Sequence, residues 1–115
     1  MSKLLPLVNI GSKSGRFKYI LAQLGQKYLI RGDSTLDYHE KIFKKLQDEA
    51  GGPLNDLYIL GGGKMQVDFE KKKINLFDQS EAYGPADHRR SKTVLQEKYP
   101  DFTISLGAPD STTKN

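Results

Sequence analysis

The sequence predicts an α/β fold of the α+β type, with a single mixed sheet of about six strands flanked by two helices. Short segments in which apolar side chains alternate with polar ones recur along the chain, which is typical of strands. Two longer segments have the helical spacing of apolar residues, and each ends at a helix-breaking glycine or proline. A chain of 115 residues supports one hydrophobic core. We therefore expect one domain over residues 1–107, followed by a disordered tail over residues 108–115.

The first predicted strand spans residues 15–24 and is partly apolar on both faces. Phe17, Tyr19 and Leu21 share one face, and Lys18, Ile20 and Ala22 share the other. A strand of this kind lies inside a sheet, with other elements on each side of it. Gly25-Gln26 predicts a tight turn, so that residues 27–31 return as the second strand of a hairpin.

A helix is predicted between Ser34 and Gly51. Ser34 and Asp37 precede an apolar-periodic run, as side chains that cap a helix N-terminus do, and Gly51-Gly52-Pro53 is a strong stop. The expected core stripe of this helix consists of Ile42, Phe43, Leu46 and Ala50. His39 comes one helical turn before Phe43, so we expect its ring on or beside the buried face.

Four more strands and one short helix complete the predicted order. The strands cover residues 57–60, which end at three consecutive glycines, and then residues 64–70, 73–77 and 102–106. Lys71-Lys72-Lys73 is interpreted as a solvated hairpin tip between two of these strands. Ser91 is predicted to cap the second helix, which Pro100 ends.

Composition narrows the classes of function. The chain has no cysteine, which excludes disulfides and thiolate catalysis, and with two histidines no metal centre or other cofactor is expected. The 18 basic and 14 acidic residues give a net charge of +4, which favours anionic partners. This charge is modest for a nucleic-acid-binding protein, and we expect neither nucleic acid nor a membrane as a partner. The apolar stretch around Pro6 is too short for a secretory signal, so a cytoplasmic location is expected.

One group of residues has the chemistry to bind and transfer a phosphoryl group. A neutral histidine attacks phosphorus when one ring nitrogen is free and the other is held by an acceptor such as a backbone carbonyl, which makes His39 the candidate. Gly61-Gly62-Gly63 offers backbone amides for an anion-binding nest, and Lys64 adds a positive charge directly after it. Lys18 and Arg31 are further candidate cations.

The loop that contains Ser80, Glu81 and Ala82 is a second candidate for phosphate binding, because its small side chains leave backbone amides accessible to phosphate oxygens. Each candidate also has a purely structural interpretation. His39 suits a core or capping position, the glycines suit a flexible turn, and Lys18 suits a side chain whose aliphatic part covers apolar surface. His88 is interpreted as a surface residue with no task.

Several blocks of the sequence resemble the phosphohistidine phosphatases of the janus/ocnus type. These blocks are Gly15-Arg16-Phe17-Lys18-Tyr19, Ile30-Arg31-Gly32 leading to Tyr38-His39, Leu60-Gly61-Gly62-Gly63-Lys64, Ser80-Glu81-Ala82-Tyr83-Gly84-Pro85-Ala86-Asp87-His88 and Lys98-Tyr99-Pro100-Asp101-Phe102. They follow the order and spacing of the family over nearly the whole chain. The resemblance implies a cytoplasmic, monomeric hydrolase that needs no metal and removes phosphate from phosphohistidine in proteins, with phospholysine as a further substrate.

The same resemblance implies that His39 is the catalytic residue, that Lys18 binds the substrate phosphate, and that the backbone around Ser80 and Ala82 contacts the anion. Inorganic phosphate or sulfate is then expected in the pocket. The residue after the glycines is often arginine in the family, and Lys64 keeps the charge but lacks the bidentate fork. Two other functions stay open: a non-catalytic module that binds phosphate or phosphoproteins in a regulatory or developmental role and, with weaker support, an RNA-binding module.

Overall fold

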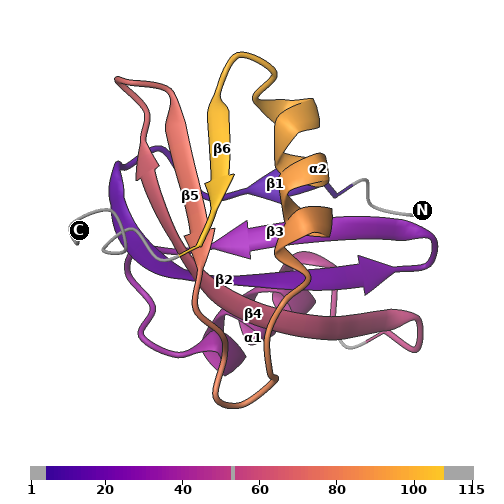
Figure 1. Ribbon diagram of the computed structural model, residues 1–115. Helices are drawn as coiled ribbons and strands as arrows, with labels where there is room; N and C mark the ends of the chain where they lie inside the picture. Colours follow the sequence, from indigo (N-terminus) through magenta and orange to yellow (C-terminus); the bar gives the residue numbers. More distant parts are fainter. Residues whose placement is uncertain (1–4, 53, 108–115) are drawn as a thin grey trace.

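Six strands form one mixed sheet in the computed structural model, which describes residues 5–52 and 54–107 (Figure 1). The strands are β1 (Val8–Asn9), β2 (Gly15–Leu24), β3 (Lys27–Gly32), β4 (Leu57–Asp68), β5 (Lys73–Phe77) and β6 (Thr103–Leu106). Their order across the sheet is β1-β3-β2-β4-β5-β6, with parallel pairing at the two edges and antiparallel pairing between the inner strands. The predicted fold class is confirmed.

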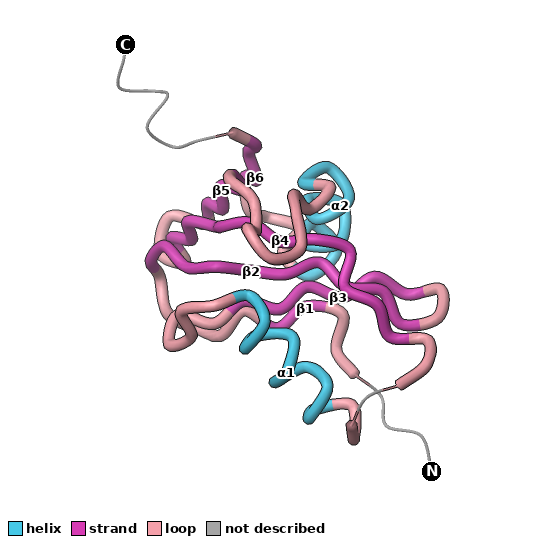
Figure 2. Tube along the Cα trace, turned by 90° about the horizontal axis from the view of Figure 1, so that it is seen from below, coloured by secondary structure: helices cyan, strands magenta, loops and turns pink. Residues whose placement is uncertain are grey.

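The two helices cover opposite faces of this sheet. Figure 2 shows α1 (His39–Glu49) on one side of the strands and α2 (His88–Lys98) on the other. The central strand β2 contributes to both cores, because its side chains alternate between the faces. Tyr19 and Leu21 join the core under α2, whereas Ile20 and Ala22 join the core under α1. The two apolar faces predicted for this strand are therefore confirmed.

Two sequence predictions about strands are wrong. Residues 57–60 and 64–70 do not form separate strands, because β4 continues through the three glycines and pairs with β2 along its length. The register shifts opposite Leu21 and Ala22, where Leu60 is the extra residue of a bulge. Glycine lowers the strand propensity of a segment, but here all three glycines pair with β2, and Gly62 also bonds the loop at Ser80 and Gly84 on its other side. The two-residue strand β1 was not predicted, because so short a segment shows no periodicity.

The predicted starts of both helices are also wrong. Tyr38 is the N-cap of α1 and makes no side-chain capping bond, while the nearby Asp33 accepts a hydrogen bond from the Thr35 amide instead. Helix α2 is capped by Asp87, whose carboxylate accepts hydrogen bonds from the first-turn amides. Ser91, the predicted cap, is buried within α2. Local sequence signals thus located both helices but misplaced their first residues.

The remaining expectations about chain organisation are met in part. The lysine-rich turn between β4 and β5 is exposed, as predicted for residues 71–73. Within residues 5–52 and 54–107, neither helix has the length and apolar character needed to cross a bilayer. The predicted disordered tail, residues 108–115, lies outside the described residues.

Candidate active site

His39 is the first residue of α1, and its ring is pressed against strand β4. The residue is 6% exposed, and its Nε2 lies 2.9 Å from the carbonyl oxygen of Gly63. A carbonyl oxygen only accepts hydrogen bonds, so Nε2 carries the proton and donates it. In the neutral ring the remaining nitrogen, Nδ1, then holds a lone pair. A backbone carbonyl on a strand far away in sequence therefore selects the tautomer.

Nδ1 of His39 faces a cavity. Among the described residues no group forms a hydrogen bond with this nitrogen. Every fully buried side-chain nitrogen or oxygen in that part of the chain does have a hydrogen-bond partner, so Nδ1 is reached by solvent. The solvent space at this ring is a cavity of about 560 Å³ that His39 lines. A nearly buried imidazole thus presents one open nitrogen to a cavity large enough for a phosphoryl group.

The surroundings of His39 favour the neutral ring. Burial lowers its pKa from the ordinary value near 6.5, and the positive charges of Lys18 and Lys64 lower the pKa further. The hydrogen bond to Gly63 and the carboxylate of Asp78 act in the opposite direction without reversing the shift. At neutral pH the ring therefore has the protonation state that a nucleophile or a general base requires.

The glycine triplet (Gly61, Gly62 and Gly63) makes room for the groups around it. A Cβ on Gly62 would lie 2.5 Å from Cδ2 of His39, and a Cβ on Gly63 would lie 2.6 Å from Cε1 of His88. A Cβ on Gly61 would overlap the backbone at Pro85. The amide of Gly62 donates to the carbonyl oxygen of Gly84, so it is not free for an anion. The triplet is a set of close-packing positions within a strand, and not the loop of free amides that the sequence suggested.

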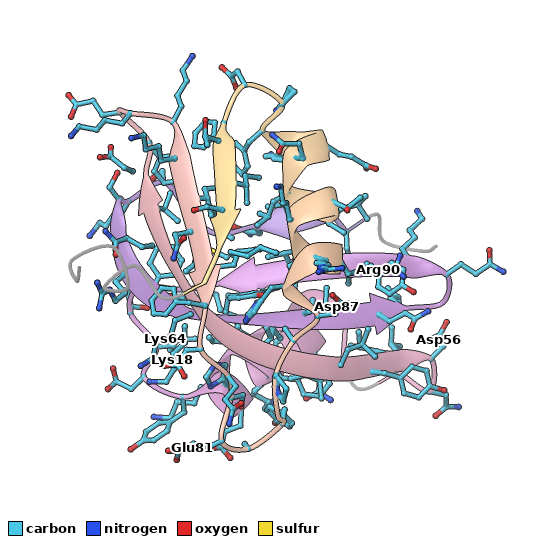
Figure 3. The ribbon with its side chains drawn as sticks, viewed as in Figure 1. Lys18, Asp56, Lys64, Glu81, Asp87 and Arg90 are labelled. Atoms are coloured by element: carbon cyan, nitrogen blue, oxygen red, sulfur yellow. The ribbon has the colours of Figure 1, made fainter. Side chains whose placement is uncertain are left out.

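Lys18 and Lys64 form a lysine pair on the floor of the cavity. They lie directly opposite each other in the β2–β4 pairing, and Figure 3 shows their side chains together. Like charges at directly opposed positions destabilise a sheet unless a counter-charge is present. Lys64 has one in Asp78, at 3.1 Å, and this contact lowers the pKa of the Asp78 carboxyl. Within the described residues Lys18 has no ion-pair partner, so one cation beside His39 is left for an anion.

The loop between β5 and α2 closes another side of the cavity, to which Glu81 and Ala82 contribute. Ser80 is buried, its amide donates to the carbonyl oxygen of Gly62, and its Oγ accepts hydrogen bonds from the amides of Ala82 and Tyr83. These bonds hold the loop against the glycine triplet. The amides of Ser80 and Ala82, both expected to bind phosphate, are thus occupied. The amide of Glu81 has no partner among the described residues and is the donor this stretch can offer to an anion.

His88 lies on the opposite face of the glycine triplet from His39, and both of its ring nitrogens are used. Nε2 donates to the carbonyl oxygen of Asp78 at 2.9 Å, and Nδ1 lies 2.5 Å from the hydroxyl of Tyr19. That hydroxyl is also 3.0 Å from Oγ of Ser91, and burial raises the pKa of Tyr19, so the phenol stays protonated. The interpretation of His88 as a surface residue without a role is wrong, because it joins α2 to the segment after β5.

Arg31 does not reach the cavity. Its guanidinium is buried beside α1, where Nε and Nη2 donate to the two carboxylate oxygens of Glu49 at 2.9 and 3.0 Å. Further donor groups of Arg31 bind the carbonyl oxygens of Ile30 and Pro6. A side chain with its donors engaged in this way anchors α1 and the N-terminal segment to β3. The expectation that Arg31 binds phosphate has no support in this geometry.

Metal ligands are not gathered at the cavity or elsewhere in the described part of the chain. No group of three or more histidine, aspartate and glutamate side chains within residues 5–52 and 54–107 is placed to hold a metal ion. Next to the open nitrogen of His39, the cavity offers one ammonium that is unpaired among the described residues, Lys18, and one paired ammonium, Lys64.

Comparison with known proteins places the chain in a family. The model of the Janus/Ocnus family matches residues 2–103. The chain is 33% identical over 113 residues to the 14 kDa phosphohistidine phosphatase of Homo sapiens, an alignment covering 89% of this chain and 90% of that protein. It is 35% identical over 114 residues to the sex-regulated protein janus-A of Drosophila melanogaster, covering 89% of this chain and 78% of the relative. The corresponding janus-A of Drosophila yakuba is 36% identical over 112 residues, covering 87% and 77%.

Proposed function

The chain belongs to the Janus/Ocnus family, and from this membership and the cavity around His39 we propose that it is a protein phosphohistidine phosphatase. It hydrolyses the P–N bond of phosphohistidine in proteins, with phospholysine as a further substrate, and it uses no metal. We also propose that this enzyme is cytoplasmic and monomeric. The relative named a phosphohistidine phosphatase supports the reaction class, whereas the name of the janus-A relatives describes regulation and no reaction.

One observation carries the proposal: His39 is nearly buried and neutral, and its open Nδ1 faces a cavity beside the lysine pair. The P–N bond of phosphohistidine is weak once the other ring nitrogen of the leaving imidazole is protonated, so catalysis needs positioning and charge stabilisation more than a strong base. In the proposed complex, the ammonium groups of Lys18 and Lys64 and the amide of Glu81 hold the phosphoryl oxygens. The phosphorus then lies opposite Nδ1.

A covalent route uses this geometry directly. The lone pair on Nδ1 attacks phosphorus, and the P–N bond of the substrate breaks. Its electron pair stays on the leaving ring nitrogen, and because the other ring nitrogen of the substrate histidine already carries a proton, that side chain leaves as neutral imidazole. The phosphorylated ring of His39 is then positively charged, and the hydrogen bond from Nε2 to the Gly63 carbonyl stabilises it. Water next attacks phosphorus, phosphate leaves, and the ring returns to its neutral form.

A general-base route uses the same atoms. Nδ1 removes a proton from a water molecule that attacks phosphorus, and the P–N bond of the substrate breaks as the new P–O bond forms. The ring of His39 becomes imidazolium while Gly63 accepts from Nε2, and it then returns its proton to solvent. The two routes differ in whether phosphate is ever bonded to His39. Rapid quenching without acid during a single turnover, followed by mass spectrometry of the protein, distinguishes them: phosphate on His39 supports the covalent route, and complete turnover without such an adduct supports the base route.

The proposal itself is tested with a phosphohistidine peptide, wild-type protein and His39→Ala. Wild type is expected to release phosphate well above the rate of spontaneous hydrolysis, and His39→Ala is expected to lose this activity. A non-catalytic binding module needs the lysine pair but not an open imidazole nitrogen. Release at the spontaneous rate by both proteins, each shown by circular dichroism to be folded, would therefore rule out the enzyme and leave the binding module. Equal release above that rate would rule out His39 as the catalytic residue.

A further inference from the structure

Exposed carboxylates line the cavity in addition to the lysine pair. A groove that continues past the lysine pair is lined by Arg16 and Asp37 as well. An acidic rim (Asp37, Glu40 and Glu81) borders the cavity from the start of α1 and from the loop between β5 and α2. Figure 3 shows Glu81 on that loop, away from Lys18 and Lys64. All three rim residues are exposed, and among the described residues none of them has an ion-pair partner.

This rim is unfavourable for phosphate alone. Three carboxylates around a phosphoryl dianion repel it, and the solvent-filled cavity screens that repulsion only in part. The open Nδ1 of His39, on a residue that is 6% exposed, independently indicates where the phosphorus sits in this cavity. A ligand that carries positive charge next to its phosphoryl group removes the conflict, because its cations face the rim while its phosphoryl group faces the lysine pair.

We propose that the site selects phosphohistidine, or another N-phosphorylated residue, that stands between lysine and arginine residues in the partner protein. Glu40 on α1 and Glu81 on the loop come from two elements, so cationic side chains that precede and follow the phosphorylated residue each meet a carboxylate. Asp37 supports the α1 side. This inference rests on the proposed function and adds its substrate class: basic N-phosphorylated segments.

The test uses two phosphohistidine peptides of equal length, one flanked by lysine and arginine and one flanked by serine and glutamine. The kcat/KM of each is measured for wild type, Glu40→Gln, Glu81→Gln and the double variant. Glu97→Gln is the matched control, because Glu97 is exposed on α2, on the other face of the sheet. Wild type should prefer the basic peptide by about tenfold at low ionic strength, as several exposed charge pairs together allow.

Each single variant should reduce that preference about two- to threefold, the double variant should nearly abolish it, and Glu97→Gln should keep the wild-type ratio. Salt at about 0.5 M should reduce the wild-type preference as well. Equal kcat/KM for the two peptides in wild type, or an unchanged ratio in the double variant, overturns the inference. The kcat/KM ratio is insensitive to loss of folded protein, because both peptides are measured on one preparation.

Failure of the proposed function gives a different result. If wild type hydrolyses neither peptide, the phosphatase is excluded, and the substrate class is then decided by binding. The same peptides with a non-hydrolysable phosphonate in place of phosphohistidine are titrated into wild type and the double variant by calorimetry. Tighter binding of the basic peptide that is lost in the double variant supports the acidic rim as its receptor, and equal affinities refute it.

Discussion

The two histidines of the chain lie on opposite faces of the glycine triplet, and each donates its Nε2 proton to a backbone carbonyl at 2.9 Å, His39 to Gly63 and His88 to Asp78. They differ at the second nitrogen. Nδ1 of His88 is paired with the hydroxyl of Tyr19, a residue of the core under α2, whereas Nδ1 of His39 faces the cavity under α1.

This difference shows what separates a reactive histidine from a structural one. Both rings are fixed in orientation by the same kind of bond, so rigidity alone does not distinguish them. Under α2, the hydroxyls of Tyr19 and Ser91 form a network that occupies the second nitrogen of His88. Under α1, the second nitrogen of His39 has no such partner and lies near the ammonium groups of the lysine pair. An open lone pair next to a lysine without an ion-pair partner among the described residues is what makes the second arrangement a candidate site for phosphoryl chemistry.

The largest expected effect comes from removing each ring in turn. His39→Ala should lower kcat/KM for a phosphohistidine peptide by about 10³-fold, because it removes the reacting group. His88→Ala should act mainly on stability, lowering the free energy of unfolding by about 1–3 kcal/mol, because it leaves the Asp78 carbonyl unpaired and the buried Tyr19 hydroxyl with Ser91 alone.

Phosphate release and urea unfolding measure the two effects separately. The comparison between the histidines fails if His88→Ala loses as much activity per folded molecule as His39→Ala while its unfolding curve matches wild type. Tyr19→Phe is the matched control on the closed face, since it removes one partner of His88 and leaves the ring in place.

A smaller effect is expected from adding one methyl group on each face. Gly62→Ala places a Cβ against His39, and Gly63→Ala places one against His88. Both should destabilise the fold by about 1–3 kcal/mol, because backbone atoms also stand in the way. Gly62→Ala should in addition lower kcat by about 10- to 100-fold, since it shifts the reacting ring. The measurement is kcat normalised to the folded fraction of each variant. Equal losses in the two variants would contradict the assignment of His39, and not His88, as the reacting ring.

The smallest expected effect is on pH dependence. Because burial lowers the pKa of His39 below its ordinary value near 6.5, kcat/KM should stay level as pH falls to about 6.5 and decline only below it. The unfolded ring binds a proton near pH 6.5, while the folded ring does so only at lower pH. The contribution of His39 to the free energy of unfolding is therefore complete above pH 6.5, where the ring is neutral in both states. It falls as the pH decreases toward the pKa of the folded state.

Urea unfolding of wild type and His39→Ala on both sides of pH 6.5 measures this contribution. The difference in unfolding free energy between the two proteins should shrink as the pH falls. A difference that stays constant, or an activity decline centred above pH 6.5, would show that the ring of His39 is not held neutral by its surroundings.

Much of the fold and part of the site follow from local patterns. The alternation of residues 15–24 placed Lys18 on the face that α1 covers, and the helical spacing after His39 placed its ring beside the sheet. The number of strands agrees with the structure, although the separate strands predicted on either side of the glycines are one strand and β1 makes up the number. By propensity, the glycine triplet predicts the end of a strand. Its position inside β4 is explained only by the rings of His39 and His88 and the backbone at Pro85, which pack against it.

Arg31 shows why the rest of the site was not predictable. Nothing in the residues around it distinguishes a phosphate-binding arginine from one that pairs with Glu49, because that partner lies 18 positions away on a helix. The hydroxyl network of His88 joins residues 69 and more positions apart in the same way. Partners of this kind are set by how helices and strands pack, which local periodicity does not encode.

The sequence by itself determined the spacing of apolar residues in each segment and the face on which each side chain lies, because these depend on neighbouring residues. It also determined the absence of thiol chemistry, which depends on composition alone. Tertiary structure decided which histidine keeps an open nitrogen, which lysine has a counter-ion and which amides are occupied. The physical reason is that the protonation and reactivity of a polar group are set by its hydrogen-bond partners and its desolvation. In this chain those partners are carbonyls, hydroxyls and carboxylates brought together from distant elements.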